Sequence, residues 1–101
     1  MAIIRPIPMT SLDSATLTGN WQQLGDALPN ACQFLRIHNT SGVDLLVSFD
    51  AVHEHDIVES GSEVWLSVTI DPLVVFKTGT TLYVKGTGPT TGLIYLIGYY
   101  C

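Results

Sequence analysis

The chain has 101 residues, of which 47% are hydrophobic and 13% are charged, and its formal net charge is −5 at pH 7. A chain of this length forms one domain with a modest core, and its charged fraction is well below the roughly 25% of an ordinary soluble domain. Its four basic residues are scattered, which argues against nucleic-acid binding through phosphates. No apolar run approaches the roughly 20 residues of a spanning helix, which argues against membrane insertion. The apolar surplus instead predicts that other protein chains cover part of the surface.

Residues 1–10 are predicted to form an extended N-terminal arm. Pro6 and Pro8 lack backbone donors and favour extended conformations in the residues before them, so a central strand is excluded and an arm or edge segment fits. The segment also lacks the basic start and long apolar stretch of a secretory signal. Three isoleucines of the arm are expected to contact a neighbouring subunit: Ile3, Ile4 and Ile7.

Residues 11–30 are polar and rich in turn-forming residues. A short strand is predicted at residues 15–18, and Trp21 and Leu24 are expected to anchor this excursion to a sheet. The pattern leaves a one-turn helix open over residues 21–24. No segment of the chain sustains helical periodicity over three turns, so no long helix is predicted.

Residues 34–57 hold the clearest strand pattern. Residues 43–50 alternate between apolar and mostly polar positions, which predicts a strand with one buried face. Residues 32–38 are apolar on both faces, which predicts a strand inside a sheet with material above and below. Between them stand four turn-forming residues, 39–42, in which Asn39 can bond its own backbone. We therefore expect a β-hairpin.

The rest of the chain continues as short strands between turns. A brief apolar run stands at residues 73–76 and a glycine-rich loop at residues 86–92. About seven to nine short strands with regularly spaced turns are typical of an all-β domain. The sequence therefore predicts a single antiparallel β-sandwich or jelly roll over residues 11–101. The further strands are predicted at residues 56–58, 63–70, 81–85 and 93–100.

The cysteines do not indicate catalysis. Cys32 and Cys101 fit a reducing compartment, and a disulfide between them is disfavoured because Cys32 sits in a predicted strand. Nucleophilic catalysis needs a nucleophile beside a base, but Cys32 and His38 would lie about 20 Å apart along a strand. The chain also has no phosphate-binding glycine loop and no nucleophile elbow. We therefore expect neither an enzyme nor a bound cofactor.

Two histidines and three carboxylates stand within residues 50–56. His53 and His55 could reach one zinc or nickel ion if this loop turns, with Asp50 or Asp56 as a third ligand. A solvated acidic loop uses the same residue types, and a His-x-His pair falls onto one face of any strand by alternation. The plain acidic loop is the preferred interpretation, so no metal site is predicted.

Aromatic side chains are the remaining candidates for a binding surface. Trp65 shares the polar face of its predicted strand with Glu63 and Ser67, so it either packs under a loop or projects toward a partner. Exposed aromatic residues can stack on sugar rings and are equally typical of protein interfaces. The apolar surplus favours a protein interface, to which three aromatic residues are assigned: Trp65, Tyr99 and Tyr100.

The order of motifs after residue 30 follows a recognisable series. A strand ends in Asn, a polar turn leads to a Ser-x-Asp strand end, and a Gly-Ser turn follows. A Gly-Thr-x-x-Tyr-Val-x-Gly strand and an apolar strand ending in aromatic residues complete the series. These elements are Asn39, residues 48–50, Gly61 with Ser62, residues 79–86 and residues 93–100. Over residues 16–101 the chain thereby resembles a group of small virion-associated proteins of tailed bacteriophages.

The resemblance implies a non-enzymatic virion component, assembled in the host cytoplasm, whose partners are other virion proteins and further copies of itself. The first hypothesis is a decoration or cement protein that binds the outside of the head at junctions between major capsid proteins. The N-terminal arm would add contacts there, and edge strands would pair with partner strands. A head–tail adaptor or collar ring, or another neck or tail protein, is the structural alternative. The alternative from another class is a glycan-binding β-sandwich module that uses Trp65 and the tyrosines.

Overall fold

The structure, a computed structural model, describes residues 5–67 and 76–100. Within them the chain is almost entirely β-structure, which confirms the predicted all-β class. The elements in these residues are β1 (Arg5–Pro6), β2 (Thr10–Asp13), a 3₁₀ helix η1 (Ser14–Thr16), β3 (Gln22–Leu24), β4 (Phe34–Asn39), β5 (Leu45–Ser48), β6 (Asp56–Val58), β7 (Glu63–Ser67), β8 (Leu82–Lys85) and β9 (Leu93–Tyr100).

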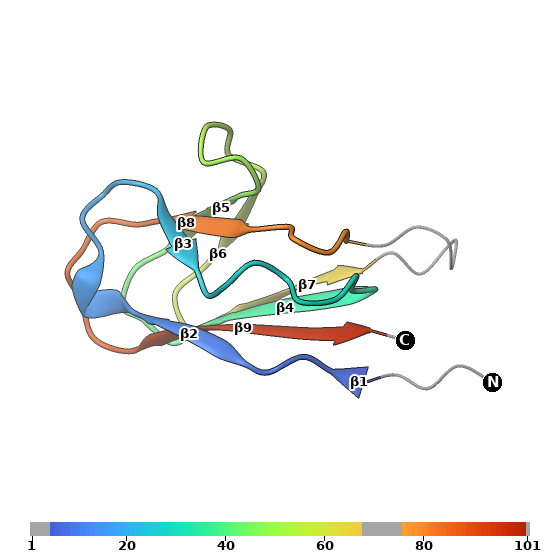
Figure 1. Cartoon of the computed structure of the whole chain (residues 1–101). Helices are drawn as coiled ribbons and strands as arrows, with labels where there is room; N and C mark the ends of the chain where they lie inside the picture. Colours follow the sequence, from blue (N-terminus) through green and yellow to red (C-terminus); the bar gives the residue numbers. More distant parts are fainter. Residues whose placement is uncertain (1–4, 68–75, 101) are drawn as a thin grey trace.

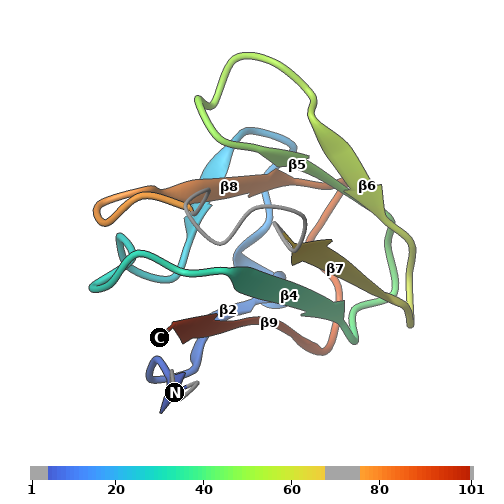
Figure 2. The same cartoon turned by 90° about the vertical axis from the view of Figure 1, so that its right-hand side faces the viewer.

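The strands form two antiparallel sheets that face each other as a sandwich (Figures 1 and 2). Sheet A has the order β1-β9-β4-β7, with β2 also paired to β9, and sheet B has the order β3-β8-β5-β6. The pairs are nested along the chain, since β2 pairs with β9, β3 with β8, β4 with β7 and β5 with β6. A chain folded back on itself in this way and rolled into two sheets is a jelly roll. The predicted β-sandwich is confirmed, with this connectivity.

The core lies between the sheets and is made by alternate residues of the strands. β4 and β9 bury every second side chain from sheet A, and β5 and β8 bury theirs from sheet B. The outward side chains of β4 are only half-buried. The prediction that this strand is covered by other parts of the protein on both faces is therefore wrong. Residues that seal the core from both sheets include Leu35, Ile37, Leu45, Val47, Leu82, Val84, Ile94 and Leu96.

The predicted hairpin over residues 34–57 is wrong, although both of its strands are present. β4 belongs to sheet A and β5 to sheet B, so the connection between them crosses from one sheet to the other. The buried amide of Asn39 fixes this crossing: its Nδ2 donates to the carbonyls of Val43 at 2.9 Å and Val58 at 3.1 Å. Its Oδ1 accepts from the amide of Ser41, the local bond that the sequence predicts.

Residues 5–13 line the edge of sheet A instead of forming an extended arm. β1 and β2 both pair with β9, and between them the amide of Ile7 donates to the carbonyl of Gly98 at 2.9 Å. The predicted edge position is therefore confirmed. Ile7 is 7% exposed and belongs to this chain's own core, so its side chain is not available to a neighbouring subunit as predicted. Ile3 and Ile4 lie outside the described residues.

The segment after β2 also differs from its prediction. Residues 14–16 form η1 instead of part of the predicted strand 15–18, because the Asp13 carboxylate accepts from the amide of Ala15 and caps a helical turn. At residues 22–24 the chain forms the strand β3, and not the helical turn that the pattern left open. Three predicted features lie outside the described residues: residues 68–70 of one strand, residues 73–75 of the apolar run, and Cys101.

Candidate interaction face

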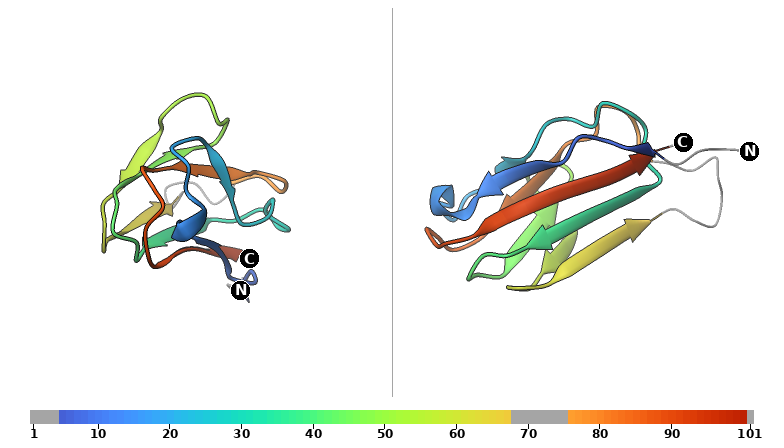
Figure 3. Two further views of the ribbon diagram at one scale, coloured as in Figure 1. Left: turned by 90° about the vertical axis from the view of Figure 1, so that its left-hand side faces the viewer. Right: turned by 90° about the horizontal axis from the view of Figure 1, so that it is seen from below.

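Sheet A turns one face to the core and the other outward, and Figure 3 (right) looks onto its outward side. There the side chains of β7, β4 and β9 lie in rows, because the register pairs Trp65 with Arg36 and Arg36 with Ile97. Five of the eight residues on this surface are aromatic or aliphatic. We call it the outer face of sheet A, and it consists of Phe34, Arg36, His38, Glu63, Trp65, Tyr95, Ile97 and Tyr99.

Trp65 projects from this face and is 53% exposed. The guanidinium carbon of Arg36 lies 5.3 Å from the centroid of its ring, within the range of a cation–π contact. The indole Nε1 donates to Oε1 of Glu63 at 3.4 Å. Two neighbours therefore orient the indole while half of its surface stays open. Trp65 therefore projects outward, and no described loop covers it.

A small charged cluster surrounds the base of Trp65. Nη1 of Arg36 donates to Oε2 of Glu63 at 2.9 Å, and Nδ1 of His38 lies 3.3 Å from the same oxygen. Burial raises the pKa of Glu63, but the hydrogen bonds from His38, Trp65 and Arg36 and the charge of Arg36 outweigh it and leave that pKa below its ordinary value. The carboxylate is therefore favoured in its charged form, and the Arg36 guanidinium offsets that charge.

Beside Trp65, across β4, the outer face of sheet A carries a shallow, open hollow. The hollow measures about 290 Å³ and is lined by Met9, Arg36, His38, Tyr95 and Ile97. Met9 is 60% exposed at its rim, and the rings of His38 and Tyr95 meet edge to face at 6.2 Å. Nε of Arg36 is buried and has no hydrogen-bond partner among the described residues. The hollow is thus lined in part by apolar side chains and in part by a guanidinium whose buried Nε is unsatisfied.

The structure separates the residues predicted for the interface. Trp65 and Tyr99 lie on the outer face of sheet A, whereas Tyr100, the last residue of β9, packs against the core. Sequence reasoning missed Tyr95 and Ile97. Their alternation with buried residues in β9 was visible in the sequence, but the two apolar faces of this strand gave no sign of which face pointed outward.

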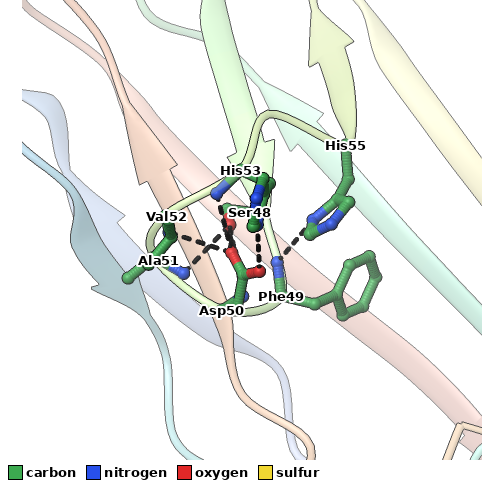
Figure 4. Close-up of polar contacts among 7 residues, drawn as sticks. All are labelled: Ser48, Phe49, Asp50, Ala51, Val52, His53 and His55. Carbon is green, nitrogen blue, oxygen red and sulfur yellow. Dashed lines mark hydrogen bonds and ion pairs between the residues drawn. The ribbon is translucent and has the colours of Figure 1, made fainter.

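The loop between β5 and β6 holds the candidate metal ligands (Figure 4). Oδ1 of Asp50 accepts from the amides of Val52 and His53, and Oδ2 lies 2.7 Å from Nδ1 of His53. Nδ1 of His55 accepts from the amide of Phe49 at 3.0 Å, so the proton of a neutral His55 ring sits on Nε2. The Asp50 carboxylate and the His55 ring thus both form hydrogen bonds that hold the loop in its conformation. Among the described residues, no group of three or more His, Cys, Asp or Glu side chains could hold a metal ion.

The hydrogen bonds in this loop favour a charged Asp50. Its pKa lies well below the ordinary value, first because of the hydrogen bond from the His53 side chain, then because of the backbone amides of His53 and Val52 and the hydroxyl of Ser48. The carboxylate thereby acts as a structural acceptor at the centre of an exposed turn.

Cys32 and His38 are not brought together. Cys32 is fully buried, and burial raises the pKa of its thiol, which disfavours the reactive thiolate. His38 lies on the outer face of sheet A beside Glu63. The arrangement provides no nucleophile–base pair between these two residues.

Charge is unevenly distributed along the chain. Residues 37–76 contain seven of the nine acidic residues and no Lys or Arg. Much of this segment forms β5, β6 and the loop between them, which projects from the side of the sandwich opposite β4 and β9 (Figures 1 and 2). We call residues 44–59 the acidic pole. On the outer face of sheet A, by contrast, Glu63 is paired with Arg36.

No known family model, curated protein or solved structure matches this chain in the comparisons made with each. The described residues contain no helix long and apolar enough to cross a membrane.

Proposed function

We propose that this chain is a non-enzymatic structural component of a tailed-phage virion, in the first place a decoration or cement protein on the assembled head. The observation that carries the proposal is the outer face of sheet A, where Trp65 stands 53% exposed beside Arg36 and Glu63 on a face with four further aromatic or aliphatic side chains. Aromatic residues and Arg are enriched at protein interfaces and dominate their energetics. The motif order supplies the phage assignment, and a jelly roll is a common fold of viral capsid proteins, which is support by analogy.

Attachment would stabilise the particle by mass action. A protein that binds the assembled shell but not its separated subunits lowers the free energy of the assembled state. Such binding needs a preformed docking surface and no reactive group. The outer face of sheet A has this character, because its most exposed aromatic side chain is already oriented by Arg36 and Glu63.

The test is the copy number of the chain in purified virions, measured by mass-resolved stoichiometry. We expect on the order of hundreds of copies per particle for a decoration protein and about a dozen for a ring at the head–tail junction. The variant Trp65→Ser should lower occupancy, while Ile57→Ser, on the outer side of sheet B and 51% exposed, should not. Absence of the wild-type chain from virions would contradict the proposal.

A glycan-binding module is the second candidate, and the surroundings of Trp65 favour it specifically. The exposed indole stands beside Glu63, Arg36 and His38, which offer the hydrogen-bonding groups that accompany an aromatic platform for a sugar ring. A glycan panel read by Trp fluorescence separates the two functions. Saturable quenching that Trp65→Ser abolishes would support the glycan site over the virion role.

A further inference from the structure

We propose that the outer face of sheet A binds a second copy of this chain and forms a two-fold dimer in which Trp65 of each copy enters the hollow of the other. The inference rests on the proposed function in that it takes this face to be a protein interface, and it assigns that interface to contacts between neighbouring copies of this chain on the particle.

The outer face of sheet A carries both a projection and a recess. Trp65 projects from β7 with half of its surface exposed, and the hollow of about 290 Å³ lies across β4, with Met9 at its rim. In a two-fold interface the same patch contacts itself, so every projection must find its recess on that patch. The outer face of sheet A satisfies this requirement.

Trp65 and the hollow lie on opposite sides of β4. β7 and β9 flank β4 on opposite sides in sheet A. Trp65 stands on β7, whereas Tyr95 and Ile97 of the hollow stand on β9. A two-fold axis that runs along β4 between two facing sheets therefore places each Trp65 over the hollow of the other copy. Facing sheets pack about 10 Å apart, a spacing that large interdigitating side chains fill.

The Trp65 side chain is already held in one orientation before any partner binds. The Arg36 guanidinium covers one part of its ring, and Glu63 accepts from its Nε1. A side chain held in its bound orientation loses less conformational entropy when the complex forms. Trp residues that fill a recess of the partner are frequent hot spots of interfaces.

The net charge of the chain also favours contact through sheet A. The chain carries a net charge of −5, so two copies repel each other unless their acidic surfaces stay apart. The acidic pole projects from the side opposite β4 and β9 (Figures 1 and 2). Contact through sheet A sends the two acidic poles to opposite ends of the dimer. It also joins faces in which Arg36 already neutralises Glu63. A strongly basic partner would instead favour the acidic pole.

The size of the face sets the expected affinity. Three or four strands about 4.8 Å apart and five to eight residues long give two faces that bury together roughly 1,000 Å², the lower end for a specific interface. We therefore expect a reversible dimer with a dissociation constant on the order of micromolar.

The experiment is sedimentation equilibrium of the purified full chain from about 1 to 300 µM, a range that brackets a micromolar constant. The wild type should convert from monomer to dimer over this range. Trp65→Ser should weaken the dimer roughly 30-fold or more, as expected for a hot spot. The matched control Ile57→Ser removes an equally exposed apolar side chain from sheet B and should leave the dimer unchanged.

A second variant tests the recess. Met9→Asp places a charge at the rim of the hollow without touching the core, because Met9 is 60% exposed, and it should weaken the dimer several-fold. Circular dichroism and thermal melting confirm that each variant is folded. A wild type that stays monomeric at the highest concentration, or a dimer that Trp65→Ser and Ile57→Ser weaken equally, would overturn the inference. A monomeric wild type that still occupies virions would overturn the dimer alone and leave the proposed function standing.

Discussion

The amide of Asn39 is fully buried where the chain crosses from sheet A to sheet B, and all of its hydrogen-bonding capacity is used. Its Nδ2 reaches the carbonyls of Val43, Val58 and Glu59, and its Oδ1 accepts from Ser41. One side chain thereby joins the end of β4 to the beginning of β5 and the end of β6. Removing it takes one donor from each of these carbonyls and leaves the amide of Ser41 without its acceptor.

We expect Asn39→Ala to lower the free energy of unfolding by about 2 kcal/mol and Asn39→Asp by about 3 kcal/mol or more. Aspartate is worse because it turns a carboxylate oxygen toward carbonyl oxygens in a buried site. Chemical denaturation measures both variants. Asn20→Asp adds the same charge at an exposed position and should change stability by less than about 0.5 kcal/mol. Equal losses for Asn39→Asp and Asn20→Asp would contradict this role.

Gly92 lies where the loop before β9 touches the crossing from β4 to β5. Its φ is +104°, and a Cβ added there would lie 2.3 Å from the carbonyl oxygen of Thr40. Gly92→Ala should therefore combine backbone strain with a clash against main chain and cost about 2 to 4 kcal/mol of stability. Gly61→Ala is the control, because Gly61 also has a positive φ but open space around it, and about 1 kcal/mol of strain alone is expected. Thermal melts of the two variants separate clash from strain.

The loop between β5 and β6 gives a prediction at the scale of one element. The pKa of Asp50 is lowered in the folded chain, so its contribution to stability is present above the unfolded pKa of about 4 and is lost as pH falls through the lower folded value. The amide resonances of Val52 and His53 should keep their positions while ordinary carboxylates titrate near pH 4, and shift only at lower pH. Asp50→Asn should remove that acid transition. A shift of these amides centred near pH 4 would contradict the assignment.

Strands were more predictable from the sequence than their partners. The residue pattern of a strand is a local property, so β6, β8 and β9 were predicted to within one residue, and the strand predicted at residues 43–50 contains the shorter β5. Pairing depends on residues far apart in the chain. The turn after β4 contains the same residue types that close a hairpin, and nothing local reveals that Asn39 instead points into the gap between two sheets. The predicted hairpin failed for that reason.

The candidate site was predictable only in part. Trp65 stood out because it is a large apolar residue on the polar face of its strand. The hollow could not be predicted, because it requires β4 and β9 to be neighbours and Met9 to lie beside them. That arrangement follows from the nested pairing of the whole chain. Arg36 was not predictable as a site residue, because it is an isolated basic residue in the sequence. The strand register places it between Trp65 and Ile97.

At the scale of the whole molecule, the low charge and high apolar content have a specific location. The residues that face outward from sheet A include aromatic and aliphatic side chains, while most acidic residues belong to the segment that contains the acidic pole. The two sides of the sandwich thus differ in character. A chain paired with a second copy through sheet A would present its acidic pole to solvent.

The nested pairing also decides when this protein can fold during its synthesis. β9 is the strand that joins β4 to β1 and β2 within sheet A, and it is the last strand described in the chain. While residues 93–100 are still inside the ribosome, the earlier strands lack the neighbour that completes their sheet. Folding must therefore wait until translation has passed this strand, and nascent chains that stop short of it expose unpaired edges that invite aggregation.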